Sequence, residues 1–362
     1  LLLALEAPFL DRLPGPEDPV TLGVFDLEDP GRTFVPLGTS SAWCWQQANM
    51  LQWLPEDPAR LVICNDFRDD RFAAVVRDAD SGGREVRVLP RPVYTLAQTA
   101  PWALTLDFAR VYAARPGYGY PNAPDPNAAN PLPDDDGVWR MDTRDGAAEL
   151  ILSLARMAAL QPAADALPQA HHWVNHLQIN PSGTRFACLH RFRSPAGARP
   201  WTTRLVTVGI DGSDPRVLAC PMVSHYDWFD DRVILAWAAP GCLPPFFYLI
   251  EDTAGSGRPG VPFCRPVGAD VLTVDGHCSF SPDRRWFVND TYPRGAERLR
   301  SLMLVRWHDG VRTDIGRFHA PPELDGEHRC DLHPNWFRDG TRVCIDSAHE
   351  GFRGVYVLDV SP

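Results

Sequence analysis

The feature that most constrains the fold of this chain is a sequence unit that recurs along it. Each copy combines an aromatic or apolar segment, a turn rich in Pro, Asp and Gly, and an alternating apolar strand. The copies recur at intervals of roughly 45–55 residues, which is the range of propeller repeats. The clearest copies cover residues 51–66, 177–192, 226–238, 280–292 and 335–348. A further apolar strand usually follows, so one unit supplies a small antiparallel sheet.

A sheet of this kind cannot bury its own faces, and the units must therefore stack into a ring. The sequence thus predicts an all-β fold, a β-propeller, in which residues 1–362 form a single domain. The clear copies and a weaker one at 93–108 give six blades by motif count. Residues 1–41 carry no such motif. We expect them to add one or two strands that pair with the C-terminal unit and close the ring, which removes exposed sheet edges.

Two segments depart from the repeat. Residues 114–137 are rich in Pro, Asn and Asp, which indicates an inserted irregular loop that could cover one mouth of the ring. Residues 147–160 have the apolar spacing of a helix, and they form the one helix that we expect.

Composition limits the partners and the cell compartment. The formal net charge is −11 and no cluster of Lys and Arg occurs, which argues against a nucleic-acid partner. The first ten residues lack a basic flank and are too short to span a membrane, so we expect no membrane association. The nine Cys form no CxxC pair and lie mostly in strand-like runs. We therefore expect buried free thiols and a cytoplasmic location, with a periplasmic one open if a leader was removed.

Five histidines hold equivalent places in successive units. His176, His225 and His277 each stand just before the apolar strand that opens a unit, and His328 and His333 hold that place in the last unit. The innermost strands of a propeller begin near one face of its channel, so these imidazoles should converge around the axis. We expect them to form a binding site, and the alternative for each is a structural or surface role.

The spacing of His328, Asp331 and His333 offers metal ligands. Residues two apart on a strand face the same side, so Asp331 and His333 could both turn inward. With His277 from the preceding unit they would give a set of three or four ligands, which suits Mn, Fe, Zn or Ni. Arg204 opens a strand and could point inward to pair with a carboxylate. A solvated position at the strand end is its alternative.

Motifs of several other enzyme classes are absent from the sequence. It contains no GxSxG, no Walker loop, no GxGxxG after a strand and no HExxH. A glycosidase pair of carboxylates stays open, because spacing in sequence does not fix their separation in a propeller. Asp227, Asp290 and Asp346 occupy equivalent places in their units, and we expect them to stabilise turns or strand ends.

The sequence resembles the oligogalacturonate lyases, which are manganese-dependent propeller enzymes of pectin breakdown. The resemblance runs from about residue 170 to the C-terminus and is weaker over residues 43–78. The segments that carry the resemblance are NHLQINPSGTRF, TRLVTVGIDGS, SHYDW, GHCSFSPDRRWFVND and HRCDLHPNWFRDGTRVCIDSAHEGFRGVYVLDV. The resemblance implies seven blades. It places His225 and Arg204 on catalytic positions, and it places on metal-ligand positions His277, His328, Asp331 and His333. The family has Gln at the position of His328 and His at that of Asp331.

By this resemblance the chain is a metal-dependent lyase that cleaves oligosaccharides containing uronic acid by β-elimination. A divalent metal, Mn by the resemblance, and Arg204 would neutralise the charge that develops on the substrate carboxylate. His225 would take the proton from the neighbouring carbon. His176 and Arg204 would bind the substrate, a small acidic oligosaccharide. The alternatives are a non-catalytic propeller that binds other proteins and a glycoside hydrolase acting in the channel.

Overall fold

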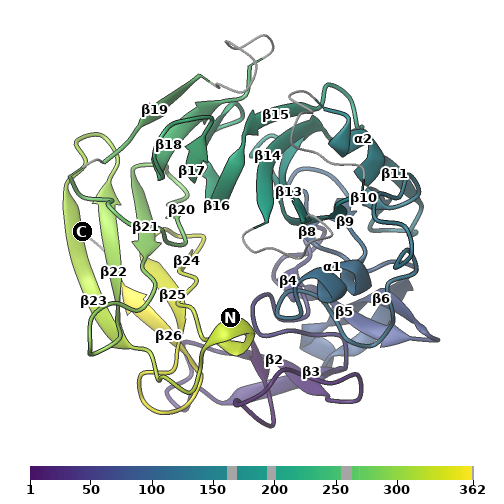
Figure 1. Cartoon of the computed structure of the whole chain (residues 1–362). Helices are drawn as coiled ribbons and strands as arrows, with labels where there is room; N and C mark the ends of the chain where they lie inside the picture. Colours follow the sequence, from purple (N-terminus) through teal and green to yellow (C-terminus); the bar gives the residue numbers. More distant parts are fainter. Residues whose placement is uncertain (161–168, 194–200, 254–262, 269, 361–362) are drawn as a thin grey trace.

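Seven antiparallel sheets are arranged in a ring in the computed structural model, which describes residues 1–160, 169–193, 201–253, 263–268 and 270–360 (Figure 1). The chain is therefore a seven-bladed β-propeller, as the resemblance implied, and the motif count of six was one blade short. The first three sheets have the bounds β1 Leu2–Glu6, β2 Val20–Phe25, β3 Phe34–Ser40; β4 Gln52–Trp53, β5 Leu61–Arg68, β6 Arg71–Asp78, β7 Arg84–Leu89; β8 Thr95–Leu96, β9 Trp102–Thr105, β10 Gly137–Asp142 and β11 Ala148–Ser153.

The remaining four sheets follow in chain order. Their bounds are β12 His171–Ile179, β13 Arg185–Arg193, β14 Thr202–Gly209, β15 Arg216–Ala219; β16 Pro221–Trp228, β17 Val233–Pro240, β18 Phe246–Glu251, β19 Cys264–Pro266; β20 Ser279–Phe280, β21 Trp286–Asp290, β22 Leu299–Arg306, β23 Arg312–His319; β24 Asn335–Trp336, β25 Arg342–Ser347 and β26 Gly354–Asp359. Neighbouring strands of each sheet run antiparallel, as in the pairs β13–β14 and β25–β26.

Burial explains which strands take which place in a blade. Seven of the nine residues of β13 are buried, because neighbouring blades cover both of its faces. None of the residues of β23, at the edge of its sheet, is buried. The middle strands therefore have continuous apolar sequences, whereas the edge strands mix polar and apolar residues. This contrast makes the repeat recognisable in the sequence.

The N-terminal segment does not pair with the last unit as we expected. Among the described strands, β1, β2 and β3 form a sheet of their own, because the apolar residues of 1–41 supply a full set of antiparallel partners. Side chains connect this end of the chain to the C-terminal blade. Gln46 donates a hydrogen bond to the Arg329 carbonyl at 3.0 Å, and the Arg353 guanidinium lies 3.9 Å from the Trp45 ring centroid.

Two short α-helices, α1 (Phe108–Ala114) and α2 (Leu154–Ala158), lie in the third blade. The helix predicted at 147–160 was wrong over its first half, where β11 pairs with β10. The backbone hydrogen bonds and packing gained at the edge of the sheet stabilise this segment more than its helical spacing of apolar residues would stabilise a helix. Two 3₁₀ turns cover Ala79–Ser81 and Gly326–His328. No helix in the described part of the chain is long and apolar enough to cross a membrane. All nine cysteines are free thiols, and six of them are buried, in line with the prediction.

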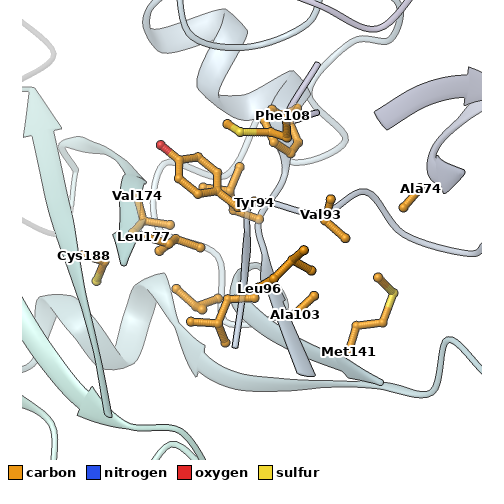
Figure 2. Packing of buried hydrophobic residues seen from close by; sticks show 14 of the residues in the cluster. Ala74, Val93, Tyr94, Leu96, Ala103, Phe108, Met141, Val174, Leu177 and Cys188 are labelled. Carbon is orange, nitrogen blue, oxygen red and sulfur yellow. The ribbon is translucent and has the colours of Figure 1, made fainter. Parts of the chain in front are cut away.

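The irregular loop predicted at 114–137 lies between α1, which ends at Ala114, and β10, which begins at Gly137, and a buried arginine anchors it. Arg110, on α1, is 1% exposed and pairs with Asp125 at 3.0 Å. Its guanidinium also donates to the carbonyls of His172 at 2.7 Å and Pro131 at 2.9 Å. Phe108 of the same helix enters the main apolar cluster, which Figure 2 shows, where its ring stacks on Tyr120 at 4.2 Å. These contacts hold the loop against the fourth blade.

Replacement of Arg110 by Leu is expected to lower the free energy of unfolding by about 3–5 kcal/mol, because Asp125 would stay buried without its partner. Arg144→Leu is the control, since this guanidinium is 64% exposed and its pair with Asp142 should contribute less than about 1 kcal/mol. Urea denaturation followed by tryptophan fluorescence measures both. Equal losses for the two variants would contradict the anchoring role of Arg110.

Candidate functional site

A cavity of about 260 Å³ lies where the first strands of the later blades converge. Four of the five histidines predicted to face the axis line it, one from each of the fourth to seventh units. The lining residues are Gln46, Gln47, Tyr94, Tyr118, His176, Leu177, Gln178, Ser224, His225, Tyr226, His277, Cys278 and His333. The repeat thus brought these imidazoles together, as the sequence indicated.

Local backbone irregularities direct these side chains. The ladder between β12 and β13 shifts register at Asn175–Gln178, and His176 within this bulge has a φ of 52°. A similar shift surrounds His225 in β16. His333 has a φ of 42°. Bulges re-aim side chains, so the irregular backbone at these residues helps to set the direction of their imidazoles.

Two of the histidines are each oriented by a carboxylate. His225 Nδ1 donates to Asp275 at 2.9 Å, and His277 Nδ1 donates to Asp290 at 2.9 Å. The two rings lie 4.1 Å apart between centroids. Because Nδ1 is engaged in both residues, Nε2 of each is the nitrogen left for a ligand or a substrate proton.

Gly276 allows the two histidine–carboxylate contacts to form side by side. Gly276 stands between Asp275 and His277, and a Cβ there would lie 1.9 Å from the Asp290 carbonyl oxygen. Only a residue without a side chain lets this segment lie against the end of β21. One short segment therefore supplies the partner of His225 and also a second histidine of the site.

The environments of the two paired histidines shift their pKa values in opposite directions. Burial and the neighbouring His277 lower the pKa of His225, although Asp275 opposes the shift. Burial also acts to lower the pKa of His277, but Asp290 outweighs it and the pKa is raised. The lowered pKa of His225 keeps its imidazole neutral at neutral pH, as a proton acceptor must be. The raised pKa of His277 means that an ion bound there would displace its proton.

Three of the four predicted metal ligands lie together. The donor atoms of His277, Asp331 and His333 all lie within 4.8 Å of one another. Burial lowers the pKa of His333 to about 3, so its imidazole is neutral and able to ligate. Burial acts to raise the pKa of Asp331, but Arg329 and other neighbouring positive charges outweigh it and the pKa is lowered, so the carboxylate is ionised.

This donor set fits a divalent transition metal. Two imidazoles and one carboxylate suit such ions, and the hydrogen bond from His277 to Asp290 is the outer-shell contact that metal-bound histidines make. Asp331 also accepts hydrogen bonds from Arg300 at 2.7 Å and Arg329 at 2.6 Å, one on each oxygen. Each oxygen keeps a second lone pair for an ion.

Two predicted site residues lie elsewhere. His328 belongs to the 3₁₀ turn Gly326–His328, and its Nε2 is 3.1 Å from the Glu323 carbonyl oxygen. It therefore lies outside the metal set, the group formed by His277, Asp331 and His333. The turn directs this side chain away from Asp331. Arg204 is fully buried in β14 and contacts the Met157 carbonyl at 3.3 Å, so it does not line the cavity.

Sequence reasoning missed Arg191, Asp275 and Asp290. Arg191 is 4% exposed and has no hydrogen-bond or ion-pair partner among the described residues. Its charge acts on His176 in the cavity, and burial together with Arg115 lowers the pKa of Arg191 to about 10. A charged residue within the apolar run FACLHRF was the signal that could have identified it.

Strand register separates Arg191 from Arg204. Arg204 pairs with His190, whereas Arg191 pairs with Thr203. Residues one apart on a strand face opposite sides, so Arg191 and Arg204 lie on opposite faces of the blade.

Comparisons with known proteins support the fold. No protein-family model matches this sequence, and no curated protein matches it significantly. The structure is similar to the oligogalacturonate lyase of Vibrio parahaemolyticus, with a TM-score of 0.52, 12% identity, and coverage of 99% of this chain and 83% of that one. It is also similar to the tricorn protease, with a TM-score of 0.52, 9% identity, and coverage of 98% of this chain and 34% of that one. An oligogalacturonate lyase in complex with manganese gives a TM-score of 0.49 at 10% identity, with 99% and 97% of the two chains covered. At these identities the likeness shows the propeller fold alone.

The metal set generates a direct test. His333→Ala is expected to weaken Mn²⁺ binding at least about tenfold, because one of three protein donors is lost. His328→Ala is the control and should leave the affinity unchanged, since that imidazole lies outside the set. Isothermal titration with MnCl₂ measures both. A loss on His328→Ala with none on His333→Ala would contradict this assignment.

Proposed function

We propose that this propeller is a divalent-metal-dependent lyase that cleaves oligosaccharides containing uronic acid by β-elimination. The observation that carries the proposal is the contact between two carboxylate-oriented histidines, His225 and His277, the second of which also belongs to the metal set. Such a site combines a proton acceptor with a place for positive charge. Elimination next to a carboxylate needs both, because removal of the proton creates a dianion.

The metal would be held by His277, Asp331 and His333, with Mn as the first candidate. When bound, it supplies positive charge that stabilises the developing charge on the substrate carboxylate. Asp290 fixes the ring orientation of His277. Arg300 and Arg329 keep Asp331 ionised and hold it in one orientation.

His225 is the proposed base. Burial lowers its pKa, so it is neutral at neutral pH, and Asp275 holds its Nδ1. Its Nε2 is then free to take the proton from the carbon beside the carboxylate. Asp275 would stabilise the imidazolium that forms, which is the usual role of a carboxylate behind a catalytic histidine.

Arg191 is better suited than Arg204 to bind a substrate carboxylate. Its guanidinium has no hydrogen-bond or ion-pair partner among the described residues and lies 5.7 Å from the Trp201 ring centroid, whereas Arg204 contacts backbone carbonyls of the α2 region. A buried cation without a counter-ion is costly, and an anionic substrate would offset that cost. His176 lines the cavity, where the charge of Arg191 acts on it, and would contact the same substrate.

The reaction is tested by ultraviolet absorbance of oligomers of galacturonate, glucuronate and mannuronate incubated with the protein and Mn²⁺. We expect absorbance to rise with at least one oligomer, because elimination leaves a double bond conjugated to the carboxylate, and chelation with EDTA should stop the rise. A saturated product would instead identify a glycoside hydrolase. Binding without any product would identify a non-catalytic propeller.

The role of His225 predicts a separation of catalysis from metal binding. His225→Ala should reduce turnover by about 10²–10⁴-fold, the usual contribution of a general base. Mn²⁺ affinity should stay within about threefold of the wild-type value, since His225 is outside the metal set. Initial rates and isothermal titration provide the two readouts. Full activity in this variant would show that another group is the base.

A further inference from the structure

The proposed β-elimination leaves one proton unassigned. The glycosidic oxygen departs with an electron pair and needs a proton, and none of the residues given a role above supplies it. We propose that Tyr118 donates this proton, which makes it the general acid of the reaction. The inference rests on the proposed function and extends it to the leaving group.

Tyr118 lines the cavity from outside the propeller repeat. It belongs to the 114–137 loop, and its ring stands edge-on to His176 with 5.6 Å between centroids. Gly119 next to it allows close approach to α1, because a Cβ there would lie 2.2 Å from the Tyr112 amide nitrogen. The loop therefore brings a phenol to the same cavity that the blades line with imidazoles.

The hydrogen bonding of Tyr118 leaves its proton available. Arg329 Nη2 donates to the phenol oxygen at 2.9 Å. Arginine has no acceptor, so the phenol oxygen accepts in this contact and its own O–H stays free. No acceptor for that O–H lies among the described residues, and the group faces a cavity that a substrate oxygen could enter.

Two cations stabilise the phenolate that proton donation would leave. Arg329 lies on the oxygen, and the Arg115 guanidinium lies 3.8 Å from the ring centroid. Glu327, 3.6 Å from Arg115, offsets part of this charge.

The other tyrosines that line the cavity are less suited to this role. Tyr226 already donates its hydroxyl proton to the His176 carbonyl. Tyr94 accepts hydrogen bonds from Gln47 and from the His176 amide, and burial raises its pKa with no guanidinium on its oxygen. Tyr118 is thus the lining tyrosine that combines a free proton with a cationic partner.

The step is balanced as follows. His225 Nε2 takes the proton from C5 of the uronide, and the C–H electron pair forms the C4–C5 double bond. The C4–O4 bond breaks, and O4 leaves with its electron pair and takes the Tyr118 proton. The enzyme is left with an imidazolium and a phenolate, and proton transfer through water restores both.

The experiment separates proton removal from leaving-group departure. The full chain with Mn²⁺ is incubated in D₂O with trigalacturonate and then with the other oligomers of the panel. Ultraviolet absorbance reports cleavage, and mass spectrometry of the unreacted substrate reports deuterium at C5. We expect Tyr118→Phe to cleave about 10²–10⁴-fold more slowly while it still exchanges the C5 proton. Mn²⁺ affinity should be unchanged.

Tyr292→Phe is the matched control. This ring also lies near Arg329, at 5.9 Å from the guanidinium carbon, and its centroid is 6.1 Å from that of His225 and 6.0 Å from that of His277, but it does not line the cavity. Its cleavage rate should stay within about threefold of wild type. Cleavage by Tyr118→Phe at the wild-type rate, or loss of C5 exchange together with cleavage, would overturn the role of Tyr118 as leaving-group acid. A wild-type chain that neither exchanges nor cleaves any oligomer would overturn the proposed function, and this inference with it.

Discussion

The blades of this protein must cover one another, and the rest of the structure depends on that constraint. The middle strands of each sheet are apolar on both faces, as in β13, and only neighbouring sheets can bury them. A ring of seven sheets satisfies this requirement and brings the first strands of successive blades toward one axis (Figure 1). Residues at equivalent places in the repeat then meet, which is how His176, His225, His277 and His333 come to line one cavity.

Charge in the site is organised around three carboxylates, of which Asp290 and Asp331 are buried and Asp275 is partly exposed. Asp275 and Asp290 each orient one histidine, and Asp331 pairs with two arginines while it lies beside two imidazoles. Arg191 remains without a counter-ion among the described residues. Arg191 therefore supplies a local positive charge that acts on His176 in the cavity, although the net charge of the protein is −11.

The inserted loop adds chemistry that the blades do not provide. Arg110 anchors it to the fourth blade, and the anchored loop presents Tyr118 to the cavity. Arg329 connects Tyr118 to Asp331, so a residue of the insertion and a candidate metal ligand share one guanidinium. Because both contacts run through this one side chain, the positions of the loop and of the metal set depend on each other.

The sequence by itself determined the propeller and the convergence of the histidines, because a repeat of constant length places equivalent residues at equivalent radii. It also identified Asp331 and His333, although the strand geometry assumed for them was wrong, because both precede β24 and His333 has left-handed backbone. Only the tertiary structure decided which other residues join them. Asp275 reaches His225 from the next blade, and Asp290 reaches His277 across a close approach at Gly276, contacts that no local pattern encodes. Strand register put Arg191 and Arg204 on opposite faces, and a 3₁₀ turn removed His328 from the metal set. Sequence spacing fixes the period of a repeat, whereas the direction of a side chain depends on bulges, register and turns that form only when the blades pack.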